Sequence, residues 1–239
     1  MKLKLLCEQA GITSTDWNAG VPPATLRSSV KPMPIDYNFP PKGHKSSLGW
    51  YDRGRLPHFD GGPIPQFFTF RLFDSVPQSL VEQWKKELDD IRFRKTVEKF
   101  LDAGHGSCFL REPAVAQMVA DSLKFHDGKK YDLASWVIMP NHLHFLARPF
   151  EGVELANIAH SIKSYTAHEA NKLLGRTGRF WQVEPFDRYI RNARHFASVV
   201  KYIENNPVKA GLVNNAADWK WSSAAERKRR GLSNVQPLT

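Results

Sequence analysis

The chain has 239 residues, of which 41% are hydrophobic, and a formal net charge of +10. This length and apolar content suffice for a sizeable core, and without any run of about 18 uninterrupted apolar residues no membrane-spanning segment is expected. Its two cysteines, Cys7 and Cys108, lie far apart without metal-ligand spacing, which argues against a disulfide framework and a structural zinc finger. The first residues turn polar too early for a signal peptide, so we expect a cytoplasmic protein.

The excess of positive charge favours a polyanionic partner, because phosphates attract lysine and arginine. Nucleic acid is favoured over an anionic membrane surface, since the basic residues of segment 179–196, RFWQVEPFDRYIRNARHF, are interleaved with aromatic residues on which bases can stack. The alternative is that these charges form an ordinary solvated surface.

The first part of the chain is predicted to be irregular and the sheet to begin after it. Residues 1–54 are expected to form an irregular extension, since the stretch 20–47 is rich in Pro, Ser and Lys and shows no apolar period. Residues 66–74, QFFTFRLFD, predict a first strand, because aromatic and apolar side chains alternate there between two faces.

Two helices are predicted between this strand and residue 128. The first covers residues 80–104, in which apolar residues recur at helical spacing: Leu80, Trp84, Leu88 and Ile91. The second begins at Pro113, a residue favoured at the first helical position, and ends by Gly128.

A hairpin follows, with strands 131–139 and 142–148 joined at Pro140-Asn141, a pair suited to the middle of a tight turn. A long helix is predicted to run from Leu155 to Gly175. Then come a strand within 179–191, interrupted by Pro185, and a helix over 195–206 that is expected to end at Pro207.

This order of elements matches a ferredoxin-like βαββαβ fold of the α+β class. It predicts an antiparallel sheet with helices on one face, an additional helix after the first strand and a further helix at the C-terminal end. We expect one domain over residues 55–223, followed by a basic flexible tail over residues 224–239.

Two histidines stand one residue apart in the second hairpin strand. His142 and His144 would face the same side of the sheet, with Leu143 and Phe145 on the other side. If helices cover the side of Leu143 and Phe145, the imidazoles form a chelating pair on the open face. The alternative is two independent histidines that are hydrogen-bonded at a sheet surface. No HExxH and no third nearby histidine closes a three-histidine zinc site.

The last helix offers a second chemical pair in YIENNPVKAGL. Tyr202 and Asn206 are four residues apart and so share one helical face. An amide oxygen suits Mg²⁺ or Mn²⁺ better than zinc, and a phenol one turn away could reach a phosphate held by the same ion. The plainer interpretation is a packing tyrosine followed by an Asn-Pro stop signal.

Taken together, these motifs carry a family resemblance from about Arg55 to Ser223. The chain resembles the insertion-sequence-200-like transposases, which are single-tyrosine HUH enzymes, and most closely their REP-associated tyrosine transposase branch. MPNHLHFL is similar to the HUH motif, with Leu143 as its bulky residue, and WQVEPFDRYIRN with YIENNPVKAGLV to the block that carries the nucleophile and the third ligand. RGRLPHFD, TFRLFDSVP and HGSCFLREP resemble further blocks of one subgroup.

The resemblance implies a divalent ion, Mg²⁺ or Mn²⁺, with three ligands: His142, His144 and Asn206. It implies that Tyr202 is the nucleophile, which attacks a DNA phosphodiester, expels a 3′-hydroxyl and leaves a 5′-phosphotyrosine that a second 3′-hydroxyl can reverse. Two other tyrosines compete for this role. We expect Tyr165 to lie in the core, and Tyr189 to shape the core or the DNA groove.

The expected partner is single-stranded or hairpin DNA, whose exposed bases can stack on aromatic residues. The candidate DNA contacts are Lys163, Arg179, Trp181, Arg188, Arg191 and Lys209. A homodimer is expected, because one tyrosine performs one transesterification whereas excision of an element needs two cuts. Two other functions stay open: a catalytically silent DNA-binding protein that recognises palindromic repeats, and a metal-dependent hydrolase that uses water.

Overall fold

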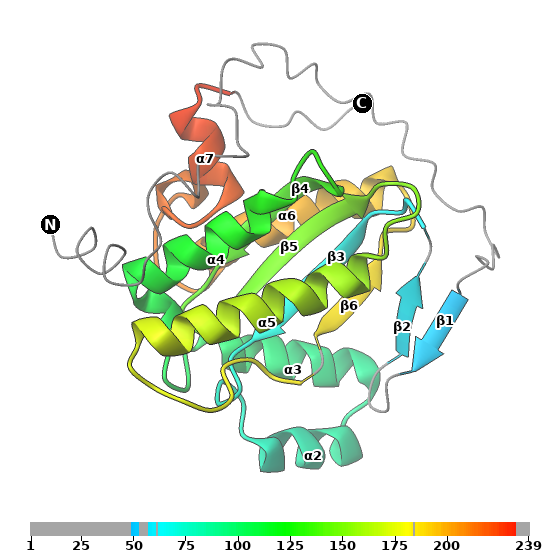
Figure 1. Ribbon diagram of the computed structural model, residues 1–239. Coiled ribbons are helices and arrows are strands. Elements are labelled where there is room, and N and C mark those ends of the chain that lie inside the picture. Colours follow the sequence, from blue (N-terminus) through cyan, green and yellow to red (C-terminus); the bar gives the residue numbers. More distant parts are fainter. Residues whose placement is uncertain (1–48, 53–56, 61, 184, 233–239) are drawn as a thin grey trace, which may run out of the picture. The chain divides into compact units, whose positions relative to one another are not determined.

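The structure is a computed structural model that describes residues 49–52, 57–60, 62–183 and 185–232. Its centre is a four-stranded antiparallel sheet in the order β4-β5-β3-β6 (Figure 1). The strands are β3 (Gln66–Arg71), β4 (Tyr131–Ile138), β5 (His142–Pro149) and β6 (Phe186–Tyr189). This order, with a helix between β3 and β4 and another between β5 and β6, confirms the ferredoxin-like α+β fold.

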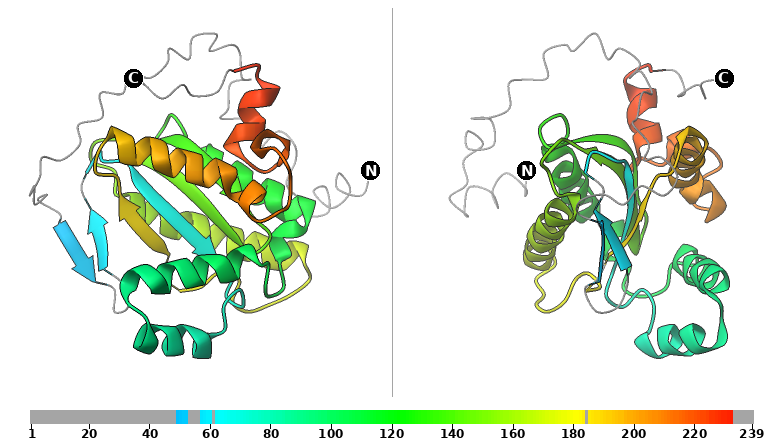
Figure 2. Two further views of the ribbon diagram at one scale, coloured as in Figure 1. Left: turned by 180° about the vertical axis from the view of Figure 1, so that it is seen from behind. Right: turned by 90° about the vertical axis from the view of Figure 1, so that its right-hand side faces the viewer.

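Helices α4 (Pro113–Phe125) and α5 (Leu155–Leu173) cover one face of the sheet (Figures 1 and 2). The main hydrophobic core lies between them and the strands, and its strand residues include Phe68, Phe70, Leu143 and Phe145. The rings of Phe68 and Phe145 stack with their centroids 5.1 Å apart. Burying a side chain of this size contributes roughly 1.5–3 kcal/mol, so this face supplies much of the driving force for folding.

The opposite face is covered by α6 (Ala193–Lys209), as the right-hand view of Figure 2 shows. We expected this helix to end at Pro207, which is wrong, because the helix continues to Lys209 and Pro207 lies inside its last turn. A proline removes one N–H donor, yet the neighbouring bonds are made: the Ala210 N–H donates to the Asn206 carbonyl at 3.0 Å. So close to the helix end, only one intrahelical bond is lost.

The single helix expected over residues 80–104 is two helices, α2 (Gln78–Glu87) and α3 (Asp90–Asp102). Leu88 is extended, and the Asp89 carboxylate accepts hydrogen bonds from the first backbone N–H groups of α3, at 3.0 and 2.8 Å. An N-cap of this kind starts a new helix, and the apolar spacing cannot reveal the break. The pair lies on the α6 side of the sheet (Figure 2). It has a small core of its own, formed by Val76, Val81 and Leu101 with Trp84, Phe93, Val97 and Phe100.

Both ends of the described chain hold more regular structure than the sequence predicted. Strand β1 (Gly49–Asp52) pairs antiparallel with β2 (Pro57–Asp60), so the irregular extension expected through residue 54 does not include residues 49–52. Residues 1–48 lie outside the described residues. No described helix is long and apolar enough to cross a membrane.

Helix α7 (Ser223–Arg229) occupies part of the expected flexible tail. Its docking depends on the carboxylate of Glu204 in α6. Both terminal nitrogens of Arg227 donate hydrogen bonds to this carboxylate, and the Ser223 hydroxyl donates to it at 2.7 Å. Ser135 of β4 donates to the same carboxylate at 3.4 Å. The basic residues of this segment therefore serve a fixed helix that joins α6 to the edge of the sheet, which the charge of the segment alone does not indicate.

Candidate active site

The two histidines of β5 lie side by side on the face of the sheet that α6 covers. His142 and His144 are 1% and 3% exposed, with ring centroids 4.8 Å apart. The predicted alternation is therefore correct, because Leu143 and Phe145 point into the core on the other face. The prediction that this face is open is wrong, however, because α6 covers it.

Each imidazole is oriented through its Nδ1 atom. The Asn141 side-chain nitrogen donates to the His105 carbonyl at 2.9 Å, which directs its oxygen toward His142 Nδ1 at 2.7 Å. That oxygen can only accept, so His142 carries its proton on Nδ1 and keeps a lone pair on Nε2. His144 Nδ1 lies 2.8 Å from the Thr69 hydroxyl on β3. Hydrogen bonds of this kind behind the ring are what histidine metal ligands require.

Tyr202 and Asn206 reach the histidines from α6. The Tyr202 hydroxyl lies 3.3 Å from His144 Nε2, and Asn206 is fully buried one turn further along. Among the described residues, His142 Nε2 and both polar atoms of the Asn206 amide have no partner at hydrogen-bonding geometry. Leaving such atoms unpaired costs about 1–3 kcal/mol each. Two imidazole lone pairs and an amide oxygen at one buried place fit a divalent cation.

The protonation states of the histidines suit this interpretation. Burial lowers the pKa of His142 to about 3; the nearby Asn206 amide opposes this shift and the charge of Lys209 adds to it. Burial also holds the pKa of His144 well below its usual value, helped by His142 and Lys209. Both rings are neutral at pH 7, as ligands must be. No group of three His, Cys, Asp or Glu side chains forms a metal cluster in the described ranges, because the third candidate ligand here is an asparagine.

The phenol of Tyr202 has two carboxylates of α3 nearby. Burial raises its pKa, and the negative charges of Glu98 and Asp102 raise it further, so the resting group is a neutral phenol. Both carboxylates also pair with Lys209, which lies 3.0 Å from Asp102. Lys209 was predicted as a DNA contact, and this stays a prediction; in the structure its ammonium pairs with these two carboxylates and its side chain is 49% exposed.

Two further predicted DNA contacts lie on the α5 side of the sheet. Trp181 is 4% exposed and its indole N–H donates to Thr166 at 2.9 Å, so its ring belongs to the core and is not available for base stacking. The Lys163 ammonium donates to the carbonyls of Gln182 and Val183, at 2.5 and 2.7 Å, and so holds the loop before β6. Arg179 is exposed in that loop.

The competing tyrosines do not reach the histidines. Tyr165 was expected in the core, but 41% of it is exposed on α5, on the opposite side of the sheet. Its place at the edge of the apolar stripe of α5 explains the error. Tyr189 is half-buried at the end of β6. Of the three tyrosines considered, Tyr202 is the one that contacts a histidine of this site.

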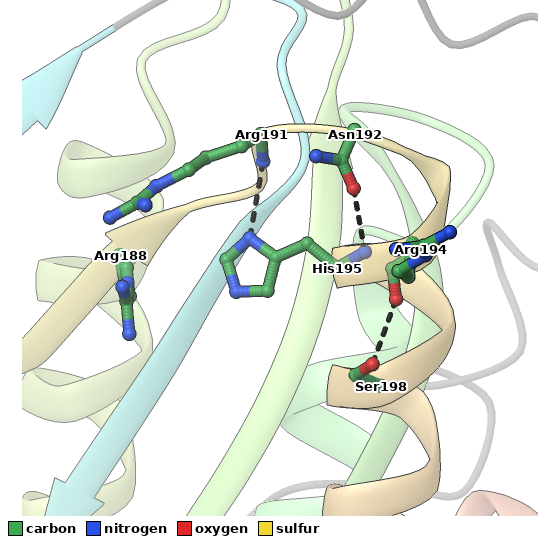
Figure 3. Close-up of a pocket in the computed structure, with 6 residues that line it drawn as sticks. All are labelled: Arg188, Arg191, Asn192, Arg194, His195 and Ser198. Atoms are coloured by element: carbon green, nitrogen blue, oxygen red, sulfur yellow. Dashed lines mark hydrogen bonds between the residues drawn. The ribbon is translucent and has the colours of Figure 1, made fainter.

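Arg188 and Arg191, by contrast, lie together in an open pocket at the beginning of α6 (Figure 3). Arg194 and His195 complete it, and neither was singled out from the sequence, although both fall within the basic-aromatic segment 179–196. Thr69 and Asn141 were also missed as partners of the histidines. Their roles depend on which strands are neighbours and on a turn side chain, which residue spacing does not reveal.

Comparison with known proteins finds a family model that matches the part of the chain holding this site. The sequence model described as IS200-like transposase matches residues 114–206. The matched segment contains both histidines, the tyrosine and the asparagine of the site, whereas α2 and α3 lie outside it.

One curated relative and one solved structure resemble a larger part of the chain. The relative is a REP-associated tyrosine transposase of Escherichia coli K12, 28% identical over 111 residues, which are 46% of this chain and 64% of the relative. The solved structure is a REP-associated tyrosine transposase bound to a REP hairpin. It is 21% identical, with a TM-score of 0.49, and the match covers 79% of this chain and 90% of that one.

Proposed function

We propose that this protein is a transposase-like endonuclease that cuts and rejoins single-stranded or hairpin DNA through Tyr202. The observation that carries the proposal is the contact of the Tyr202 hydroxyl with His144 Nε2, 3.3 Å away, beside the unpartnered His142 Nε2 and Asn206 amide. The match of residues 114–206 to the IS200-like transposase model, and the similarity to a relative named a REP-associated tyrosine transposase, support it.

The proposed metal ligands are the Nε2 atoms of His142 and His144 and the amide oxygen of Asn206. A hard oxygen ligand beside two neutral imidazoles suits Mg²⁺ or Mn²⁺. When bound, such an ion withdraws charge from a non-bridging phosphate oxygen and favours the ionised form of a nearby phenol. The hydrogen bonds from Asn141 and Thr69 keep both rings turned toward this position.

In the proposed reaction, α6 presents the Tyr202 oxygen to the phosphorus in line with the 3′-oxygen of the neighbouring nucleotide. A bond forms from the phenolic oxygen to phosphorus, and the bond from phosphorus to the 3′-oxygen breaks. The phenolic proton is lost and the departing 3′-oxygen gains one, so the step needs no net proton. The phosphotyrosine keeps much of the phosphodiester energy, and a second 3′-hydroxyl can reverse the step without ATP.

The test uses short hairpin oligonucleotides with randomised single-stranded flanks, incubated with the protein and Mn²⁺. A DNA-shifted protein band on a denaturing gel is expected for the wild type and for Tyr165→Phe and Tyr189→Phe, and no band for Tyr202→Phe. Mass spectrometry should find the nucleotide on the Tyr202 peptide. The nucleotide on another tyrosine would overturn the assignment. Cleavage without adduct would indicate a water-using hydrolase, and binding without cleavage a silent DNA-binding protein.

We also propose that the protein acts as a homodimer, because excision of a DNA element needs two cuts and each site has one tyrosine. Sedimentation with and without the hairpin oligonucleotides tests this. A mass of two chains is expected in the presence of DNA, and one chain under both conditions would contradict the proposal.

A further inference from the structure

The pocket at the beginning of α6 gathers cationic and hydrogen-bonding groups from two elements (Figure 3). Its lining residues come from β6, from the turn after it and from the first turns of α6: Arg188, Arg191, Asn192, Arg194, His195 and Ser198. The backbone N–H of Arg191 donates to His195 Nδ1 at 3.2 Å, which leaves the imidazole proton on Nε2 as a further donor. Guanidinium and imidazole donors grouped in this way suit a phosphate.

The charges in the pocket are crowded. The pKa of Arg188 is lowered, first by burial and then by the positive charges of Arg191 and Arg94. The pKa of His195 is lowered by burial and by the same Arg188 and Arg191. Such mutual repulsion is unfavourable in the free protein, and a bound anion would relieve it.

Two structural links join this pocket to the candidate active site. His195, Ser198 and Tyr202 follow one another at helical spacing along α6, which places the pocket about 6–10 Å from the tyrosine along the helix axis. On the sheet, Arg188 of β6 pairs with Phe67 of β3, and the Phe67 ring lies 6.0 Å from the Tyr202 ring. The pocket and Tyr202 thus share one face of the molecule.

We infer that the pocket binds a backbone phosphate of the same DNA strand that Tyr202 cuts, and that it determines which phosphodiester reaches the tyrosine. Successive phosphates advance by about 3.4 Å along the helix axis of a stacked strand and by more in an extended one. A span of about 6–10 Å therefore corresponds to about one to three nucleotides from the cut. The inference rests on the proposed function.

The experiment neutralises single phosphates. An oligonucleotide cleaved by the wild type is synthesised with one methylphosphonate at each position near the cut, and adduct formation is timed. At one position, about one to three nucleotides from the cut, the methylphosphonate should slow adduct formation by the wild type about tenfold relative to unmodified DNA. The same methylphosphonate should hardly slow Arg188→Ala, because this variant has already lost the contact to that phosphate. Arg188→Ala should also cut the unmodified strand at neighbouring phosphodiesters.

Arg194→Ala serves as a second variant from the other element, and Lys172→Ala, exposed on α5, as the control in which the wild-type pattern should persist. Equal methylphosphonate effects in the wild type and both arginine variants, with an unchanged cut site, would overturn the inference. If the wild type forms no adduct at all, the proposed function fails instead. The pocket is then tested by binding of the hairpin oligonucleotides: the slope of log K against log salt should fall by about 0.7 in Arg188→Ala, and an unchanged slope overturns it.

Discussion

The two faces of the central sheet are built by alternating residues of the same strands, and both are buried, yet one buries apolar side chains and the other buries polar ones. On the α5 side, Phe68 and Phe145 stack in a dry core. On the α6 side, the adjacent positions carry Thr69 and His144. Burial of apolar atoms stabilises the fold, whereas burial of polar atoms without partners costs free energy. The α5 face therefore stabilises the fold, whereas burying the polar atoms of the α6 face away from water lowers the free energy of unfolding.

The sharpest test of this division is the removal of an imidazole. His144→Ala should abolish adduct formation, since it removes a proposed ligand and the contact to Tyr202, while most hairpin DNA affinity persists. Adduct gels and fluorescence anisotropy measure the two properties. Wild-type cleavage by this variant in chelating buffer would remove the metal from the mechanism.

The adjacent residue on the other face should show the opposite pattern. Phe145→Ala leaves a cavity in the main core and should lower the free energy of unfolding by about 3–5 kcal/mol, as measured by urea titration. Cleavage per folded molecule should stay near that of the wild type under stabilising conditions. A loss of stability as large in His144→Ala would break the comparison, because it would make both faces structural.

A third prediction concerns the polar contacts that fasten α6 over its face. Glu204→Gln removes the charge that pairs with Arg227 and should lower the free energy of unfolding by about 3 kcal/mol, because a partly buried guanidinium loses its counter-charge. The matched control is Glu226→Gln, whose partner Arg230 is mostly exposed, and which should cost less than about 1 kcal/mol. Equal effects in urea titrations would contradict the structural role of Glu204.

The smallest expected effect comes from the hydrogen bond between Thr69 and His144 Nδ1. Thr69→Val keeps the shape of the side chain and removes the hydroxyl beside His144 Nδ1. Metal affinity should weaken about 10- to 100-fold, with little change in stability. Isothermal titration with Mn²⁺ measures the affinity, and Thr69→Ser, which keeps the hydroxyl, should restore most of it. Unchanged Mn²⁺ affinity in Thr69→Val would show that this hydrogen bond does not tune the site.

The sequence predicted the parts of this molecule that depend on local periodicity. Alternation and helical spacing located β3, β5 and α5, and placed His142 and His144 on one side. The break at Asp89 escaped prediction, because a capping side chain competes with an apolar stripe that continues through it. Trp181 was misassigned because the same basic-aromatic segment serves both the core and the pocket of Figure 3. Burial depends on neighbours that are distant in sequence, which one segment does not specify.

The docking of α7 has a consequence for when α6 is fully attached during synthesis of the chain. The helix that carries Tyr202 is fastened partly by Arg227, which the ribosome adds 25 residues later, the difference between these two residue numbers. Until that segment leaves the exit tunnel, Glu204 can contact Ser135 of β4 but lacks Arg227 and Ser223, so α6 is without its attachment to α7. The order of translation therefore delays this attachment of the helix that carries Tyr202 until Arg227 has left the ribosome.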